Sequence, residues 1–163
     1  MQIWNSIEEA GQAIAALDTY SVVTIGNFDG VHRGHQAIIQ RITALGREKQ
    51  HLSVVLTFAK HTGNFLGKQP PLLNPPGLRR ELLRRQGLDA VLEAEFNEKM
   101  ANLSPELFFQ EWLVERLRVK NMVIGHDFKF GAGGRGNYQL LRALATRRQI
   151  DIEQINPVLS CGG

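Results

Sequence analysis

The sequence predicts an α/β fold, in which helices cover both faces of a mainly parallel sheet. Short apolar runs at residues 21–25, 52–58 and 121–125 are rich in valine and isoleucine. Such continuous runs are typical of parallel strands that are buried on both faces. Amphipathic helical patterns separate the runs, and strand, helix and strand in that order form a βαβ unit. Repeated along the chain, this alternation indicates one α/β domain.

The first half of the chain contains two predicted helices around the first strand. Ser6 and Glu9 form a capping box that opens a helix ending near residue 17. The apolar face of this helix is expected to consist of Ile7, Ala10, Ile14 and Leu17. After strand 21–25, a second apolar helical face is formed by Ile38, Ile39, Ile42 and Leu45. Residues 59–76 contain four prolines and are expected to form a long loop.

The second half begins with a predicted helix over residues 78–86, followed by a strand at 89–92. Ser104, Pro105 and Glu106 are a strong helix start, with a cap, a proline and an acid in sequence. That helix is expected to end near residue 117 and to face the core with Leu107, Phe108, Trp112 and Leu113. Asn137 is expected to cap a helix over 138–147, and the alternating residues 150–153 indicate an edge strand.

The composition limits the class of protein. The chain has 163 residues, of which 43% are hydrophobic, and we expect a single domain over residues 1–163. The net charge of +3 suits small anionic substrates without requiring nucleic acid. A single cysteine, Cys161, excludes an internal disulfide framework and a cysteine-rich metal site. The sequence shows neither a signal peptide nor an apolar run of membrane-spanning length, so we expect a cytoplasmic protein.

Four arginines on one predicted helix raise the question of nucleic-acid binding. They are Arg79, Arg80, Arg84 and Arg85. Aromatic residues, on which bases would stack, do not alternate with them. We therefore interpret this cluster as a solvated helix face, and we expect no nucleic-acid partner.

The most informative stretch follows strand 21–25. It is formed by Gly26, Asn27, Phe28, Asp29, Gly30, Val31, His32, Arg33, Gly34 and His35. The turn leads from a strand end into a helix N-terminus, where ligands of α/β sheets bind and backbone N–H groups attract anions. Gly30 and Gly34 allow the backbone to approach a phosphate, and His32 and His35 lie on one side of a helical turn. From spacing alone, a metal half-site or two plain surface residues remain alternatives.

A second glycine-rich stretch follows strand 121–125. Gly131, Gly133 and Gly136 match the G-x-G-x-x-G pattern of dinucleotide-binding domains, with Asp151 as a possible ribose ligand. However, residues 126–130 separate this pattern from its strand, whereas the dinucleotide fingerprint opens directly from one. A flexible flap, or glycines that serve turn geometry, is the favoured interpretation.

Together the motifs resemble a known family. His-x-Gly-His resembles the signature of the nucleotidyltransferase superfamily, and Gly-Asn-Phe-Asp-Gly-Val-His-Arg-Gly-His resembles the adenylyltransferase module of bacterial bifunctional riboflavin kinase/FAD synthetases. The run from Gly125 through Asp127, Phe128 and Phe130 to Gly131 is similar to a further motif of that family. The pair at residues 96–97 and the run at residues 103–106 are also similar to the family. The resemblance therefore covers essentially the whole chain.

The resemblance implies a Rossmann-like nucleotidyltransferase fold and an activity. Enzymes of this family transfer AMP from ATP to FMN, giving FAD and pyrophosphate, with a divalent metal that is usually Mg²⁺. It implies His32 and His35 as catalytic residues, and no protein metal ligands are assigned. It further implies an ATP and phosphate site made of Gly26, Asn27, Phe28, Asp29, Gly30, Gly34, His61 and Asp127, and a flavin site made of Phe58, Phe128 and Phe130.

The chain also departs from the family pattern. In the family's Thr-Phe-acid-Pro-His-Pro motif, Thr57, Phe58 and His61 match, but Ala59 replaces the acid and Lys60 the first proline. The sequence ends at Gly163, about where a Ser-Ser-Thr-x-Ile-Arg segment would begin, and no riboflavin kinase domain follows. A C-terminally incomplete domain and a relative with fewer phosphate contacts both fit this pattern.

Three functions stay open at this point, two of them nucleotidyltransferases. The first is an FMN adenylyltransferase, and the second is a nucleotidyltransferase that uses a different acceptor. The third is a module that binds a nucleotide or flavin without catalysis, which the altered second motif and the absent arginine segment favour. NADH binding would instead favour a dehydrogenase. The oligomeric state cannot be derived from these patterns.

Overall fold

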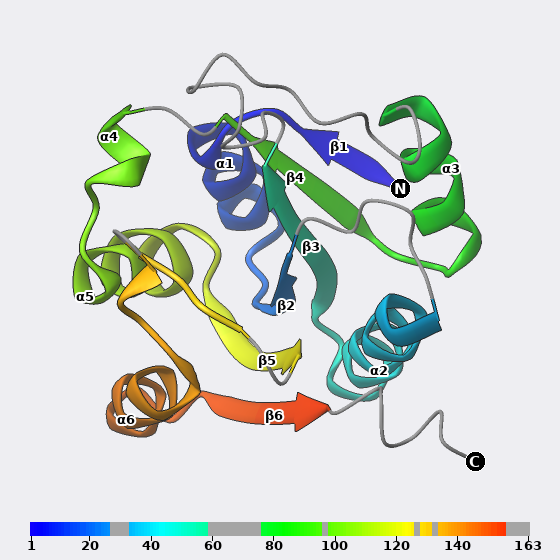
Figure 1. Ribbon diagram of the computed structural model, residues 1–163. Helices are drawn as coiled ribbons and strands as arrows, with labels where there is room; N and C mark the ends of the chain where they lie inside the picture. The colour runs from blue at the N-terminus through cyan, green and yellow to red at the C-terminus, as the bar shows by residue number, and fades with distance from the viewer. Residues whose placement is uncertain (27–32, 59–75, 96–97, 126–127, 132–133, 156–163) are drawn as a thin grey trace.

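The computed structural model describes residues 1–26, 33–58, 76–95, 98–125, 128–131 and 134–155 (Figure 1). A six-stranded parallel sheet in the order β1-β4-β3-β2-β5-β6 forms its centre. The strands are β1 (Gln2–Trp4), β2 (Ser21–Ile25), β3 (Leu52–Phe58), β4 (Ala90–Ala94), β5 (Val119–Gly125) and β6 (Asp151–Ile155). The helices are α1 (Ile7–Leu17), α2 (Arg33–Lys49), α3 (Pro76–Arg85), α4 (Glu98–Ala101), α5 (Pro105–Phe108), η2 (Phe109–Arg116) and α6 (Tyr138–Arg147). The predicted α/β class is confirmed.

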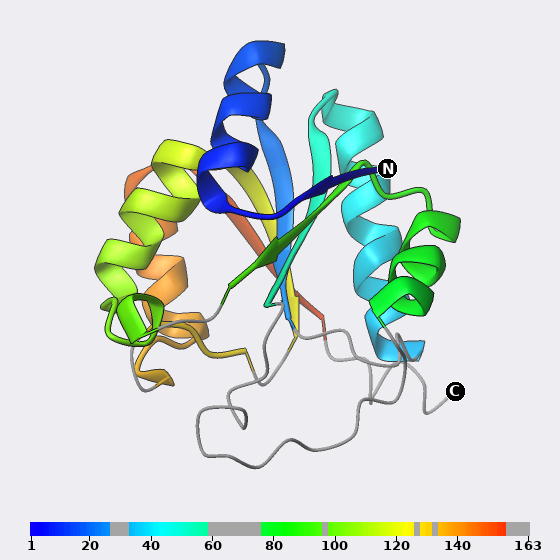
Figure 2. The same cartoon turned by 90° about the horizontal axis from the view of Figure 1, so that it is seen from above.

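Helices cover both faces of the sheet (Figure 2). On one face, α2 and α3 pack over a core cluster that includes Val22, Ile39 and Leu83. On the other face, α1, α5, η2 and α6 cover a larger cluster that includes Ile14 and Leu113. Side chains on the two sides of each strand therefore pack into two separate apolar layers, as expected for a parallel sheet buried on both faces.

The capping box of α1 is confirmed. The Ser6 hydroxyl accepts a hydrogen bond from the Glu9 N–H at 3.1 Å, and the Glu9 carboxylate accepts one from the Asn5 N–H at 2.9 Å. The expectation that Leu17 faces the core is wrong, because this side chain is 62% exposed. The last turn of α1 projects past the strands, so an apolar residue there has no sheet to cover (Figure 2).

The helix predicted after Ser104 is present but changes its geometry. Ser104 caps α5, and the chain then continues as the π-helix η2, in which the Leu117 N–H donates to the Trp112 carbonyl five residues earlier. Leu107 is 51% exposed, against expectation, whereas Phe109 is buried. In this arrangement the consecutive residues Phe108 and Phe109 both face the core.

The two edge strands of the sheet are β1 and β6. β6 is an edge strand, as predicted, while the opposite edge strand β1 was not predicted. β1 pairs with β4 and has three residues. Three residues are too few to give a recognisable sequence pattern. Along the described ranges, no helix combines the length and apolar character that crossing a membrane requires.

Candidate functional site

The strand order reverses at β2, and this creates the candidate site. The next strand along the chain, β3, pairs on one side of β2, while β5 pairs on the other. All pairs are parallel, so the segments that leave β2 and β5 start at the same edge of the sheet. Ligands of open α/β sheets bind in the crevice outside such a reversal. The two motifs singled out in the sequence follow these two strands.

The first motif begins at the end of β2. The Gly26 N–H donates to the Leu56 carbonyl at 3.0 Å, which extends the ladder to β3 by one residue. α2 then begins at Arg33, which places Gly34 and His35 in its first turn. That turn contains no acidic residue, unlike the first turns of α1 and α5. The described residues of this turn therefore offer no carboxylate to its backbone N–H groups, which suits an anionic ligand.

Most of the other expected catalytic and ATP-binding residues lie outside the described residues. They are Asn27, Phe28, Asp29, Gly30, His32, His61 and Asp127. The structure gives the end of each strand from which these segments leave, so the motif around His32 and the one around Asp127 belong to neighbouring strands.

The second motif forms a compact turn beyond β5. Phe130 and Gly136 pair as an antiparallel bridge through two backbone hydrogen bonds of 3.1 and 2.8 Å. Gly131 adopts a φ of 79°, and a Cβ added to it would lie 2.6 Å from the Pro105 nitrogen. These glycines therefore serve turn geometry and close packing, and α6 begins only after them, at Tyr138. This arrangement differs from a dinucleotide fingerprint, in which the glycines lead directly from strand to helix.

The three phenylalanines expected to bind flavin share the larger core cluster. Phe128 and Phe130 are buried and stack on each other, with centroids 5.5 Å apart and an interplanar angle of 17°. Phe130 also lies 6.1 Å from the Phe108 ring. Phe58, the last residue of β3, is only partly buried. Of the three, Phe58 is therefore the most accessible to a ligand.

An ion pair between α3 and β4 was not foreseen from the sequence. Arg80 holds the buried Glu93 through two hydrogen bonds, of which the Nε–Oε2 bond is 2.8 Å long and the other joins Nη2 to Oε1. These bonds raise the pKa of Arg80 above its usual value. A charged residue within the apolar run Ala90–Ala94 was the signal available in the sequence.

The other arginines of α3 are only partly described. Arg84 and Arg85 both pair with Glu81 at the surface. Three of the four clustered arginines thus have carboxylate partners within the protein, one of them buried.

The described part of the motif holds no metal cluster. In the ranges that the structure describes, no three His, Cys, Asp or Glu side chains gather so as to hold a metal ion. A cavity of about 320 Å³ lies elsewhere, between the start of α1 and η2. Its lining includes Ser6, Lys99, Trp112 and Arg116 and none of the residues expected at the site.

Comparison with known proteins decides the family. A model of the FAD synthetase family matches residues 14–162. This chain belongs to the FAD synthetase family. The bifunctional riboflavin kinase/FMN adenylyltransferase of Escherichia coli K12 is 37% identical over 133 residues, which are 80% of this chain and 42% of that protein. The protein of the same name from Buchnera aphidicola (Acyrthosiphon pisum) is 33% identical over 147 residues, which are 89% of this chain and 47% of that protein.

The family member described here thus spans less than half the length of these relatives. Solved structures support the fold alone. A crystal structure described as a macrolide-efflux protein from Streptococcus pneumoniae has a TM-score of 0.76 at 22% identity, covering 94% of this chain and 49% of that one. A pantothenate synthetase from Thermus thermophilus has a TM-score of 0.52 at 18% identity, covering 96% of this chain and 61% of that one.

Proposed function

We propose that this chain is an FMN adenylyltransferase domain, which transfers AMP from ATP to FMN and releases pyrophosphate. The observation that carries the proposal is the family match over residues 14–162, combined with a His-x-Gly-His motif that follows β2 in the sequence and runs into the first turn of α2 at the reversal of strand order. We further propose that residues 1–163 form a single domain that acts in the cytoplasm. Its partners are the small molecules ATP and FMN, without nucleic acid or membrane.

The proposed reaction is an in-line displacement. A phosphate oxygen of FMN attacks the α-phosphorus of ATP, and the bond from that phosphorus to the bridging oxygen of pyrophosphate breaks. Such a transfer requires positioning and charge stabilisation rather than a covalent intermediate. His32 and His35 would donate hydrogen bonds to phosphoryl oxygens where negative charge develops, and the first turn of α2 would add its backbone N–H groups.

The other expected site residues are proposed to bind the nucleotide or the flavin. The turn around the nucleotide would consist of Gly26, Asn27, Phe28, Asp29 and Gly30. Gly34, His61 and Asp127 would complete the ATP site. Among Phe58, Phe128 and Phe130, Phe58 is the one we propose to contact the flavin ring, because it alone is not fully buried. The stacked pair Phe128 and Phe130 would support the site from within the core.

Mg²⁺ is part of the proposal as a companion of ATP. This ion prefers oxygen ligands, keeps several waters and is commonly held by substrate phosphates with one or two carboxylates. Asp127 is the carboxylate that the family motif offers for this purpose, which is compatible with the absence of a ready-made cluster among the described side chains. When bound, the ion would offset the negative charge of the phosphates.

One assay tests the proposal directly. The purified chain is incubated with ATP, FMN and Mg²⁺, and FAD and pyrophosphate are separated by chromatography. We expect FAD from the wild-type chain. If none forms, the assay is repeated with the chain extended by a Ser-Ser-Thr-x-Ile-Arg segment. Failure of both proteins would contradict the proposal, and binding of ATP or FMN without turnover would then indicate a binding module.

The choice of acceptor needs a second set of assays. Phosphopantetheine is offered in place of FMN with ATP, and the phosphorylated acceptors of cytidylyltransferases are offered with CTP in place of ATP. Product formation with one of them, and none with FMN, would favour a nucleotidyltransferase of different specificity.

A further inference from the structure

The hydroxyl of Thr24 is buried and has no partner. Thr24 is 1% exposed, and its Oγ1 forms no hydrogen bond. It is the fourth residue of β2, two positions before Gly26, where the histidine motif starts. A buried polar group without a partner reduces stability, so its retention at this place calls for a functional explanation.

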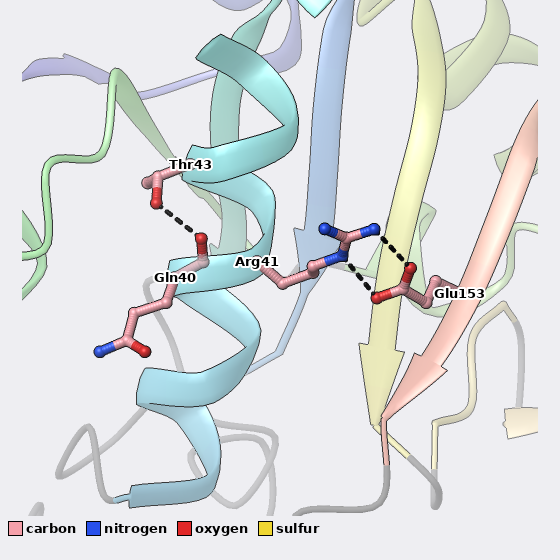
Figure 3. A network of polar contacts seen from close by, with 4 residues as sticks. All are labelled: Gln40, Arg41, Thr43 and Glu153. Carbon is pink, nitrogen blue, oxygen red and sulfur yellow. Dashed lines mark hydrogen bonds and ion pairs between the residues drawn. The ribbon is translucent and has the colours of Figure 1, made fainter. Parts of the chain in front are cut away.

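The other buried hydroxyls of this region are satisfied. Ser21 donates to the Leu117 carbonyl at 2.6 Å, and Ser53 donates to the Asp89 carboxylate at 3.2 Å. Thr43, on α2, donates to the Gln40 carbonyl at 2.9 Å, as Figure 3 shows. Within the described ranges, the only other buried side-chain atom without a partner is Nδ1 of His51, which precedes the opposite end of β3.

The position of Thr24 relates its hydroxyl to α2. Side chains alternate along a strand, so Thr24 shares a face with Val22, which belongs to the core cluster under α2 and α3. Figure 3 shows that α2 crosses this face and that its first turn lies at the end of the sheet where the strand arrows point. Thr24 is thus the residue of β2 on this face that lies nearest to that turn.

We infer that Thr24 is a positioning residue for ATP. The inference rests on the proposed function. Because Oγ1 is inaccessible to solvent, it acts through the first turn of α2 rather than by touching the nucleotide. When phosphates bind at this N-terminus, the turn settles onto the strand ends, and the Thr24 hydroxyl gains a hydrogen-bond partner.

The test compares three variants of the full chain. Thr24→Val removes the hydroxyl at nearly constant shape, and Thr24→Ser retains it. Thr43→Val removes a buried hydroxyl that already has a partner. For each protein, the melting temperature is measured with and without ATP and Mg²⁺, and the kinetic constants for ATP and FMN are measured separately.

We expect Thr24→Val to melt no lower than wild type without ligand, since it loses no hydrogen bond. Its ATP-induced rise in melting temperature should shrink, and its kcat/KM for ATP should fall about tenfold, with a smaller change in KM for FMN. Thr24→Ser should restore both. Thr43→Val should melt lower than wild type but keep the ATP-induced rise.

Several results would overturn the inference. A normal ATP-induced rise in Thr24→Val, or a loss of ligand-free stability that accounts for the whole effect, means that Thr24 is structural. If wild type binds ATP without forming FAD, the proposed reaction fails, but a reduced ATP-induced rise in Thr24→Val still supports its role. A wild-type chain that binds no ATP overturns both.

Discussion

Two histidines carry the proposed chemistry, and a third serves as a control. His32→Ala or His35→Ala should lower the rate of FAD formation by about 10²–10³-fold, the usual effect of removing one donor to a developing oxyanion. His51→Ala should leave the rate unchanged, because His51 precedes the opposite end of β3, where its ring lies edge-on to Tyr20 at 5.7 Å. Circular dichroism checks that all three variants fold. Unfolding of the His32 or His35 variant, with normal turnover per folded molecule, would assign these residues a structural role.

Replacing Arg80 should destabilise the protein, because its partner Glu93 is buried. Arg80→Met leaves a carboxylate that is 5% exposed without its bidentate partner. We expect the free energy of unfolding to fall by about 2–3 kcal/mol. This is less than the full cost of breaking a buried pair, because the Arg80 side chain is itself partly exposed. Urea denaturation measures the change, and the double variant Arg80→Met with Glu93→Leu should recover most of it.

A surface pair on the same helix provides the comparison for Arg80. Arg84→Met breaks a pair with Glu81 in which both side chains are well exposed. We therefore expect the free energy of unfolding to fall by at most about 1 kcal/mol. Equal losses of unfolding free energy in the two arginine variants would show that burial of Glu93 adds nothing.

The pKa of Arg80 is raised, so its contribution to stability is present at neutral pH and is lost only as the pH rises through that raised value.

At the scale of elements, the glycine turn after β5 is fixed by contact with α5. Gly131→Ala should lower the free energy of unfolding by more than about 1 kcal/mol, since the new Cβ meets the backbone of Pro105 in addition to the cost of a positive φ. Gly134→Ala is the matched control, because Gly134 also has a positive φ but an added Cβ would meet only Lys129 at 3.8 Å. Thermal unfolding of both variants separates steric overlap from backbone strain. Equal losses would contradict the packing argument.

The elements that the sequence predicted well are those with local signals. The bounds of β2, β3 and α6 agree with the apolar runs and the Asn137 cap, because the signals that mark these elements lie in their own residues and immediate neighbours. β1 and the π-helix η2 depend on pairing with a distant strand and on packing against the sheet. Periodicity could not show either. The error at Leu17 has a different cause, since the last turn of α1 projects past the strands.

At the scale of the whole molecule, the site follows from the order of the strands. The sequence placed one motif after β2 and another after β5, but only the pairing of these strands shows that both motifs leave adjacent strands. Sequence reasoning could not find the Arg80–Glu93 pair or the unpartnered Thr24 hydroxyl, since both are properties of packing. The catalytic and ATP-binding roles assigned to the histidine motif stay predictions.

Ligand-induced stabilisation tests the molecule as a whole. A ligand present at about 100 times its dissociation constant stabilises the folded state by about 2.7 kcal/mol, which corresponds to a rise of roughly 5–10 °C in melting temperature for a chain of this size. We expect such a rise with ATP and Mg²⁺, a further rise with FMN, and none with NADH. The first two follow from an adenylyltransferase site at the strand reversal, and the third follows because the glycines after β5 form a turn against α5 instead of a dinucleotide fingerprint. Stabilisation by NADH alone would contradict this assignment and favour a dehydrogenase.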